Sequence, residues 1–306
     1  MPRGKSIDYR DIDGILLLDK PSGQSSNQAL QRVRRLYRAR KAGHCGSLDP
    51  LATGLLPICL GQATRFSSYL LGASKIYRAG CRLGQTTATG DAEGEIVGES
   101  PVSVDENRLA RVLAGFLGSS EQVPPMYSAL KHEGRRLYEL AREGRQVERE
   151  ARRIEIYRLE LLAFESPRIE IEVHCSKGTY IRTLAEDIGS ALGCGAHLDA
   201  LRRTAVDTLG LEDSVDMERL ERLADSGTEA LDALLLPASA ALSHYPELEL
   251  AADSARDIRQ GKRLRTSRGE TPGLYRLICV ESGFIGLGEV SADGELAAKR
   301  LMNTAR

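Results

Sequence analysis

Residues 43–57 read Gly-His-Cys-Gly-Ser-Leu-Asp-Pro-Leu-Ala-Thr-Gly-Leu-Leu-Pro, and this segment decides how the rest of the chain is interpreted. Its glycines and prolines constrain the backbone, so they predict a rigid loop rather than a packed helix. The loop carries one carboxylate, Asp49, and one imidazole, His44. A turn in which Asp49 caps the backbone before Pro50 explains the pattern without any chemistry. A loop that holds both side chains at a cleft is the functional alternative.

The segments around this loop predict an irregular alternation of strands and helices. Strands are expected at 14–18, 169–174, 274–280 and 284–290, and helices after Ser25 or Ser26, after Ser103 in a capping box with Glu106, and over 181–192 before Gly193. Because no regular strand–helix–strand rhythm is present, we expect an α+β fold whose mixed, largely antiparallel sheet has flanking helices. The last two strands read as a hairpin in a small β-rich unit. We therefore predict two domains, 1–248 and 249–306.

The charge of the chain is unevenly distributed, although its formal net charge is only -1. Residues 1–80 carry a net +8, whereas residues 209–259 carry a net -8. Within the first block, Arg34, Arg35 and Arg38 lie on a predicted helix in a run without acidic residues. A solvated helix face and an anionic partner both explain such a run, and charge asymmetry of this kind is typical of nucleic-acid-binding chains.

Several classes of protein are not indicated by the sequence. The six cysteines are scattered and form no Cys-x-x-Cys pair, so neither a disulfide framework nor a metal site is predicted. No glycine-rich or lysine motif for a nucleotide is present, and we expect no cofactor. No apolar stretch approaches the ~20 residues that span a bilayer, and because the first residues contain no apolar run we expect no signal peptide. We expect a cytoplasmic protein without a membrane partner.

Seven segments, in order, resemble the motifs of one protein family, the bacterial tRNA pseudouridine-55 synthases of the TruB family. They are Leu18–Ser26, Gly43–Pro57, Lys75–Arg78, Leu83–Gly94, Gln122–Lys131, Cys175–Leu184 and His197–Thr204. Two departures from the family motifs are mild. Ser25 stands where the family usually has Thr, and Ser47 where it usually has Thr or Ala. The resemblance implies the pseudouridine synthase fold and, for the C-terminal unit, a small PUA-like RNA-binding domain.

This resemblance also implies an activity and a substrate. The family isomerises the uridine at position 55 of the tRNA T loop: the C1′–N1 bond breaks, the base rotates, and C5 is joined to C1′. The partner is then tRNA, bound through its T stem-loop; no protein partner is implied, and we expect a monomer. Because the target base is stacked inside the loop, it must be flipped out, which costs a few kcal/mol.

The same resemblance assigns roles to individual side chains. Asp49 is the catalytic carboxylate, which either attacks C1′ or takes the 2′ proton. Arg182 would lie beside it and hold its pKa down, although without the resemblance a surface arginine is the simpler interpretation. Tyr77 would stack on the flipped base, and His44 would occupy the gap that it leaves. The remaining pocket residues implied by the family are Lys20, Tyr180 and Leu201, of which Leu201 could equally be a core residue.

Two alternatives to the synthase remain open from the residues themselves. A non-catalytic RNA-binding or tRNA-folding protein would use the basic helix and the C-terminal unit alone. Such a binder has no need of Asp49 on a stiffened loop, so this residue discriminates between the two hypotheses. A more distant alternative is a hydrolase in which Asp49 and His44 act as an acid–base pair.

Overall fold

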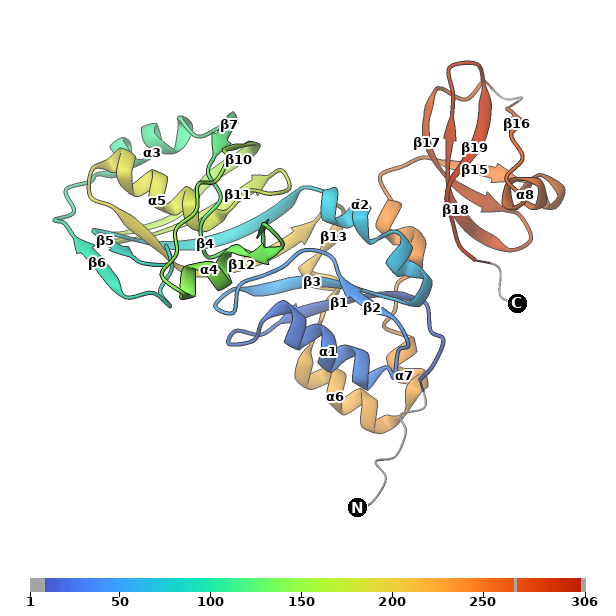
Figure 1. The fold of residues 1–306 in the computed structure, drawn as a ribbon, viewed down its shortest axis with the longest axis horizontal. Helices are drawn as coiled ribbons and strands as arrows, with labels where there is room; N and C mark the ends of the chain where they lie inside the picture. The colour runs from blue at the N-terminus through green and yellow to red at the C-terminus, as the bar shows by residue number, and fades with distance from the viewer. Residues whose placement is uncertain (1–8, 267–268, 304–306) are drawn as a thin grey trace.

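The structure is a computed structural model that describes residues 9–266 and 269–303. Figure 1 shows a large part that holds the N-terminal four-fifths of the chain and a smaller β-rich part at the C-terminal end. Both parts are built on sheets with helices packed against them. This arrangement confirms the predicted α+β class with a β-rich C-terminal unit.

The large part is organised around a mixed sheet of ten strands within the described residues. Two pairings are parallel, β1 with β14 and β12 with β3, and the other pairings are antiparallel, as predicted. In spatial order the strands are β14 (Val215–Asp216), β1 (Gly14–Lys20), β3 (Thr53–Leu60), β12 (Ala196–Val206), β4 (Lys75–Leu83), β11 (Arg168–Cys175), β10 (Arg152–Glu165) and β7 (Gly118–Gln122), with β2 (Ala42–His44) on β3 and β13 (Leu209–Gly210) on β12.

Helices cover this sheet at both ends. At one end lie α1 (Ser26–Leu36), α6 (Met217–Ser226) and α7 (Thr228–Asp232), and at the other α3 (Glu106–Ala114) and α5 (Ile181–Leu192) (Figure 1). The remaining helical elements are η1 (Gly61–Arg65), α2 (Ser67–Gly72), α4 (Leu137–Arg142), η2 (Leu211–Asp213) and η3 (Ala238–Leu242), and two small hairpins are formed by β5 (Gln85–Thr87) with β6 (Ile96–Glu99) and β8 (Lys131–His132) with β9 (Arg135–Arg136).

Local sequence signals account for most of these boundaries. Ser25 caps α1 in a capping box with Gln28, and α5 ends at Gly193, whose φ of 76° is the left-handed conformation that glycine favours. The expected capping box of α3 at Ser103 is wrong. The helix begins at Glu106, because the nearer Asp105 carboxylate accepts a hydrogen bond from the Arg108 backbone N–H at 2.7 Å.

The C-terminal part contains a second sheet packed against α8 (Ala252–Arg259). Its spatial order is β15 (Glu247–Leu250), β17 (Gly273–Cys279), β18 (Gly283–Val290), β19 (Glu295–Leu301) and β16 (Leu264–Arg265), and β17 with β18 is the predicted hairpin. The predicted division after residue 248 falls inside β15, all four of whose residues pair with β17. We therefore propose a division just before β15.

The two parts meet through aromatic side chains. The ring of Phe66 lies 5.4 Å from that of Phe284 on β18, and the ring of Tyr69 packs edge to face, at 6.1 Å, on that of Tyr245 in the segment that leads into β15. These contacts seat the second sheet against η1 and α2 rather than against the helices at the far end of the large sheet. No helix in the described part of the chain is both long and apolar enough to cross a membrane.

Candidate active site

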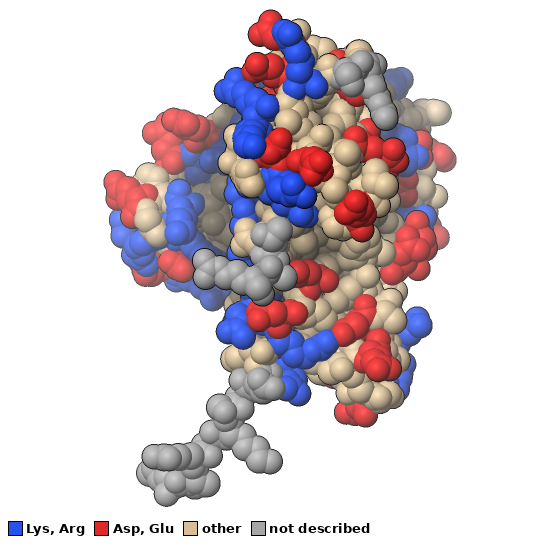
Figure 2. Space-filling model, turned by 90° about the vertical axis from the view of Figure 1, so that its right-hand side faces the viewer, with Lys and Arg blue, Asp and Glu red and all other residues tan. Residues whose placement is uncertain are grey.

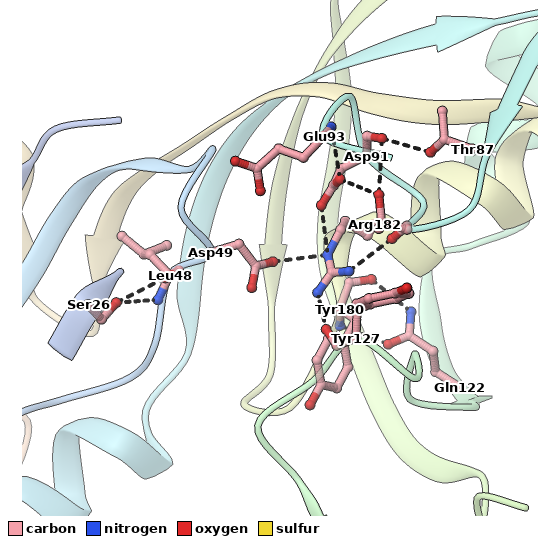
Figure 3. Close-up of polar contacts among 11 residues, drawn as sticks. Ser26, Leu48, Asp49, Thr87, Asp91, Glu93, Gln122, Tyr127, Tyr180 and Arg182 are labelled. Carbon is pink, nitrogen blue, oxygen red and sulfur yellow. Dashed lines mark hydrogen bonds and ion pairs between the residues drawn. The ribbon is translucent and has the colours of Figure 1, made fainter. Parts of the chain in front are cut away.

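Asp49 lies on the loop between β2 and β3, and the loop is anchored by the first turn of α1. The Ser26 hydroxyl accepts a hydrogen bond from the Leu48 backbone N–H at 2.7 Å, and it lies 3.0 Å from the Leu48 carbonyl oxygen, to which it donates (Figure 3). The Asp49 backbone carbonyl then accepts from the Ala52 N–H at 3.1 Å, so the turn is closed by the backbone and not by the Asp49 side chain as predicted. The side chain stays 43% exposed, so the carboxylate is held by its backbone yet accessible from outside.

Arg182, in the first turn of α5, makes the central polar contacts of the site. Its Nε lies 2.9 Å from Asp49 Oδ2 and 3.6 Å from Asp91 Oδ2. Its terminal nitrogens donate to the carbonyl oxygens of Thr89 at 2.9 Å and Tyr127 at 2.6 Å (Figure 3). The side chain is only 4% exposed, so the interpretation of Arg182 as a surface arginine is wrong. A fixed fork of donors suits such a site, because each of the three nitrogens meets oxygens of different residues.

A second carboxylate, Asp91, completes this cluster and was not identified from the sequence. It is buried, accepts a hydrogen bond from the Thr89 hydroxyl at 2.5 Å, and accepts another from the Glu93 backbone N–H at 3.2 Å. The only local signal is an aspartate within a Thr-Gly-Asp turn, which by itself indicates side-chain capping of the turn. Its proximity to Arg182 depends on chain folding over some ninety residues, which no local pattern records.

The environment of Asp49 raises the pKa of its carboxyl group. Burial among protein groups is the largest cause, the Arg182 charge opposes it, and the Asp91 charge adds to it. Arg182 therefore acts in the predicted direction, but the expectation that the pKa lies below its usual value is wrong. A carboxylate that is harder to ionise is a stronger base once ionised, which suits both a nucleophile and a proton acceptor.

Tyr77 and Leu201 lie on the same face of the sheet as the Asp49 loop, on β4 and β12. Each side chain is 9% exposed and belongs to the main core cluster. Burial raises the pKa of the Tyr77 hydroxyl, while the charge of Arg203 on β12 opposes the shift. Tyr77 is therefore a neutral phenol, and the Asp49 charge adds to the rise in its pKa. Leu201 shares this position, so its core and pocket interpretations are compatible.

Tyr180 lies directly before α5 and is held by its backbone. Its N–H donates to the Gln122 side-chain oxygen at 2.8 Å, and its carbonyl accepts from the Gln122 amide nitrogen at 3.1 Å (Figure 3). Burial is the main cause that raises the pKa of its hydroxyl. Gln122, at the end of β7, thus joins an edge strand of the sheet to the start of α5.

Lys20 and His44 surround the loop from the other side. Lys20 is fully buried, and its Nζ donates to the carbonyls of Pro21 at 2.8 Å and Gln24 at 2.6 Å. Burial lowers the Lys20 pKa to about 8, although the Asp49 charge opposes this. Burial also lowers the pKa of His44, whose Nδ1 has no hydrogen-bond partner among the described residues. His44 is therefore neutral at pH 7 and free to accept or donate through that nitrogen.

The three arginines predicted on one helix are not part of the Asp49 cluster, and the prediction is wrong for Arg38, because α1 ends at Leu36. Arg34 donates to the carbonyls of Ala39 at 3.2 Å and Arg40 at 3.1 Å, so it also stabilises the end of its own helix. Arg35 donates to the Gln31 carbonyl, and Arg38, whose φ is 51°, begins the turn after α1. The hydrogen bonds of Arg34 and Arg35 thus go to carbonyl oxygens and not to carboxylates.

Metal chemistry has no candidate site among residues 9–266 and 269–303, where no cluster of three His, Cys, Asp or Glu side chains could hold an ion. The six cysteines are free thiols, all buried. Cys45 and Cys59 approach one another, with 3.3 Å between their sulfur atoms. The polar groups gathered at the site are Asp49, Asp91, Arg182 and the tyrosines.

Comparison with known proteins points to one family throughout the chain. Residues 34–181 match the N-terminal domain of the TruB family pseudouridylate synthases, residues 182–243 a tRNA pseudouridylate synthase B C-terminal domain, and residues 246–302 the C-terminal domain of pseudouridine synthase II TruB. The chain is 53% identical over 303 residues to the tRNA pseudouridine synthase B of Nitrosococcus oceani, covering 99% of this chain and 98% of that protein.

A second relative agrees with this, and a solved structure shares the fold. The tRNA pseudouridine synthase B of Pseudomonas aeruginosa is 53% identical over 296 residues, covering 96% of this chain and 97% of that protein. The fold is similar to a chain in the structure of an H/ACA RNP bound to a substrate RNA containing 2′-deoxyuridine. There the TM-score is 0.74 at 24% identity, with 95% of this chain and 85% of that chain covered.

Proposed function

Because the chain belongs to the TruB family of pseudouridylate synthases, we propose that it converts uridine 55 of the tRNA T loop to pseudouridine by means of Asp49. The chain is a tRNA pseudouridine synthase, an isomerase, as its near full-length relatives are. The position of the target uridine and the role of the aspartate are the proposed steps. The observation that carries them is the ion pair between Asp49 and the buried Arg182. Asp49 Oδ2 lies 2.9 Å from Arg182 Nε, while the Asp49 side chain remains accessible.

The proposed reaction balances within the substrate. The C1′–N1 bond breaks, the uracil rotates, a C1′–C5 bond forms, and the hydrogen on C5 is lost while N1 gains one. Asp49 either attacks C1′ to form an ester that the returning base displaces, or takes the 2′ proton to give a glycal. Both routes need the ionised carboxylate, which the Arg182 guanidinium favours against the effect of burial.

The neighbouring side chains fit the handling of a flipped base. We assign Tyr77 as the platform on which the base stacks, with Leu201 and Tyr180 completing the apolar wall. An aromatic platform contributes about 1–3 kcal/mol for a stacked base, which offsets the unstacking of the target. We assign His44, which is neutral and whose Nδ1 has no hydrogen-bond partner among the described residues, to the gap in the RNA.

Lys20 supports the loop from below. Its Nζ lies 3.5 Å from the Pro50 carbonyl, and its charge lowers the pKa of Asp49 from the buried side. We therefore assign Lys20 to holding the loop and its carboxylate, rather than to direct contact with the base. This narrows the pocket role that the resemblance implies for it.

The surface charge is suited to a folded RNA. Figure 2 shows Lys and Arg side chains gathered around the hollow at the left of the view. Residues 1–80, which include Arg34, Arg35 and Arg38, carry a net +8. We propose that these arginines contact phosphates of the T stem while Asp49 reaches the loop. We propose further that the acting unit is a monomer that works in the cytoplasm.

Mapping of the product on an unmodified transcript tests this proposal. The protein is incubated with an unmodified tRNA transcript, and pseudouridine is then mapped by carbodiimide modification and primer extension. The expected result is a single new stop that corresponds to position 55, absent from a transcript in which that uridine is replaced by cytidine. Pseudouridine only at other positions, or none at all, would overturn the assignment of the target.

A further inference from the structure

The largest fully buried side chain of the protein is an arginine next to the site, Arg203 on β12, which is 1% exposed. Its Nε donates to the Leu55 carbonyl at 2.7 Å, and one terminal nitrogen donates to the Gly46 carbonyl at 3.1 Å. Among the ion pairs of the described residues, none includes Arg203. A buried cation whose partners are carbonyl oxygens and the Tyr77 hydroxyl, without a carboxylate, is costly, and an apolar side chain would stabilise a core at least as well.

The two carbonyl groups that accept from Arg203 lie at the two ends of the Asp49 loop. Gly46 precedes Asp49 by three residues, and Leu55 follows it by six. One guanidinium therefore links the two ends of the loop through hydrogen bonds. The backbone is adapted to this approach: Gly46 has φ 108° and Gly54 has φ 99°, and a Cβ at Gly54 would overlap the backbone of Arg203.

Arg203 also faces the proposed base platform. In the β12–β4 pairing, Arg203 lies directly opposite Tyr77, and its charge opposes the burial that raises the Tyr77 pKa. Five other ionisable groups interact electrostatically with Arg203 or Tyr77: Lys20, His44, Asp49, Lys75 and Cys175. The same side chain thus contacts the Asp49 loop and faces Tyr77.

We infer that Arg203 is a positioning residue for the isomerisation: its hydrogen bonds to Gly46 and Leu55 hold the loop and so fix the Asp49 carboxylate relative to the Tyr77 ring. This inference rests on the proposed catalytic role of Asp49. A misplacement of about 1 Å in reacting groups can lower a rate by about 10²-fold. A lysine at this position keeps the charge but lacks the rigid guanidinium fork, and its single Nζ cannot occupy both the Nε and the terminal-nitrogen positions that now meet Leu55 and Gly46.

The test compares Arg203→Lys with a matched control on the adjacent residue. Arg202→Lys is the same substitution on the same strand, but Arg202 points to the opposite face, where it is paired with Asp19 at 2.6 Å. Single-turnover rates on tRNA, the tRNA Kd and the melting temperature are measured for both variants across pH. We expect Arg203→Lys to lose about 10²-fold in rate at every pH, with a Kd within a few-fold of wild type, and Arg202→Lys to retain its rate.

Each outcome has a defined meaning. A folded Arg203→Lys protein with the wild-type rate overturns the inference, as does a loss that appears in Kd alone. If Arg203→Lys does not fold, Gly46→Ala perturbs the contact between Arg203 and Gly46 from the loop side. A folded Gly46→Ala protein with the wild-type rate also overturns the inference. A fully active Asp49→Asn protein would instead contradict the proposed function, so the two failures are distinguishable.

Discussion

Replacing Arg182 by glutamine removes the charge beside Asp49 while keeping a hydrogen-bonding side chain. The ionised form of Asp49 is required in both proposed routes, and the Arg182 guanidinium favours that form from 2.9 Å. Without it, the Asp49 pKa rises further above its usual value, so a larger fraction of the enzyme is protonated and inactive at a given low pH. The acidic limb of the pH–rate profile is therefore expected to move to higher pH.

The size of this movement follows from the geometry. An opposite charge within about 4–6 Å shifts a carboxyl pKa by about 1–3 units. Because the Asp49 side chain is 43% exposed, water screens part of the interaction, and we expect the lower half of that range, about 1–2 units. At pH values below the Asp49 pKa of both wild type and variant, each unit by which the pKa rises corresponds to about a tenfold lower rate.

The variant also leaves the buried Asp91 carboxylate without its cation. Breaking a buried pair in this way costs about 3–5 kcal/mol in the free energy of unfolding. Urea unfolding therefore accompanies the kinetic measurement, so that rates are compared only for the folded fraction.

The assay is a single-turnover pH–rate profile on a tRNA transcript between about pH 5 and 9, limits chosen around the usual range of carboxyl and imidazole titration. The control is Arg168→Gln. Arg168 Nε also lies 2.9 Å from an aspartate oxygen, Asp199 Oδ2, but its side chain is 51% exposed and does not contact Asp49. We expect its profile to match wild type. An Arg182→Gln profile whose acidic limb stays at the wild-type pH would refute the electrostatic role of Arg182.

Three further outcomes are expected. Replacing Arg34, Arg35 and Arg38 by glutamine should weaken tRNA binding and reduce the slope of log K against log salt by about 2–3, as filter binding at several salt concentrations would show; an unchanged slope would return these side chains to a solvated surface. Lys75→Met should lower the free energy of unfolding by about 1–3 kcal/mol in urea titrations, because its Nζ donates to three carbonyls at the end of α2, and unaltered stability would contradict that role. Gly54→Ala should lower the melting temperature and the free energy of unfolding by about 1–3 kcal/mol, since φ is 99° and the added Cβ meets the β12 backbone; a fully stable variant would argue against this packing.

Elements with a regular period were predictable from the sequence. The alternation of Ile169, Ile171 and Val173 identifies β11, and the apolar stripe before Gly193 identifies α5, because each pattern directly records which face is buried. The Asp49 loop was predictable for a different reason, since its glycines and prolines leave few other conformations. The cap of α3 was mispredicted because Ser103 and Asp105 are both good caps, and only the helix start at Glu106 decides between them.

The features that sequence reasoning missed depend on contacts between distant segments. Asp91 joins the site only because the Arg182 side chain reaches across to its loop, and Arg203 is indistinguishable in sequence from Arg202 next to it. Their side chains point to opposite faces of β12, one into the core and the other into an ion pair with Asp19. The sign of the Asp49 pKa shift was missed likewise, because burial is set by packing and is invisible in a charge pattern.

The most direct test of the proposed mechanism compares Asp49→Asn with Asp105→Asn on unmodified tRNA. Asparagine has nearly the size of aspartate but can neither attack C1′ nor take a proton, whereas at Asp105, the exposed N-cap of α3, it caps as well as aspartate. We expect no pseudouridine at position 55 with Asp49→Asn, together with a tRNA Kd close to wild type, and normal product with Asp105→Asn. Product formed by Asp49→Asn at the wild-type rate would contradict the central claim that the Asp49 carboxylate carries the reaction.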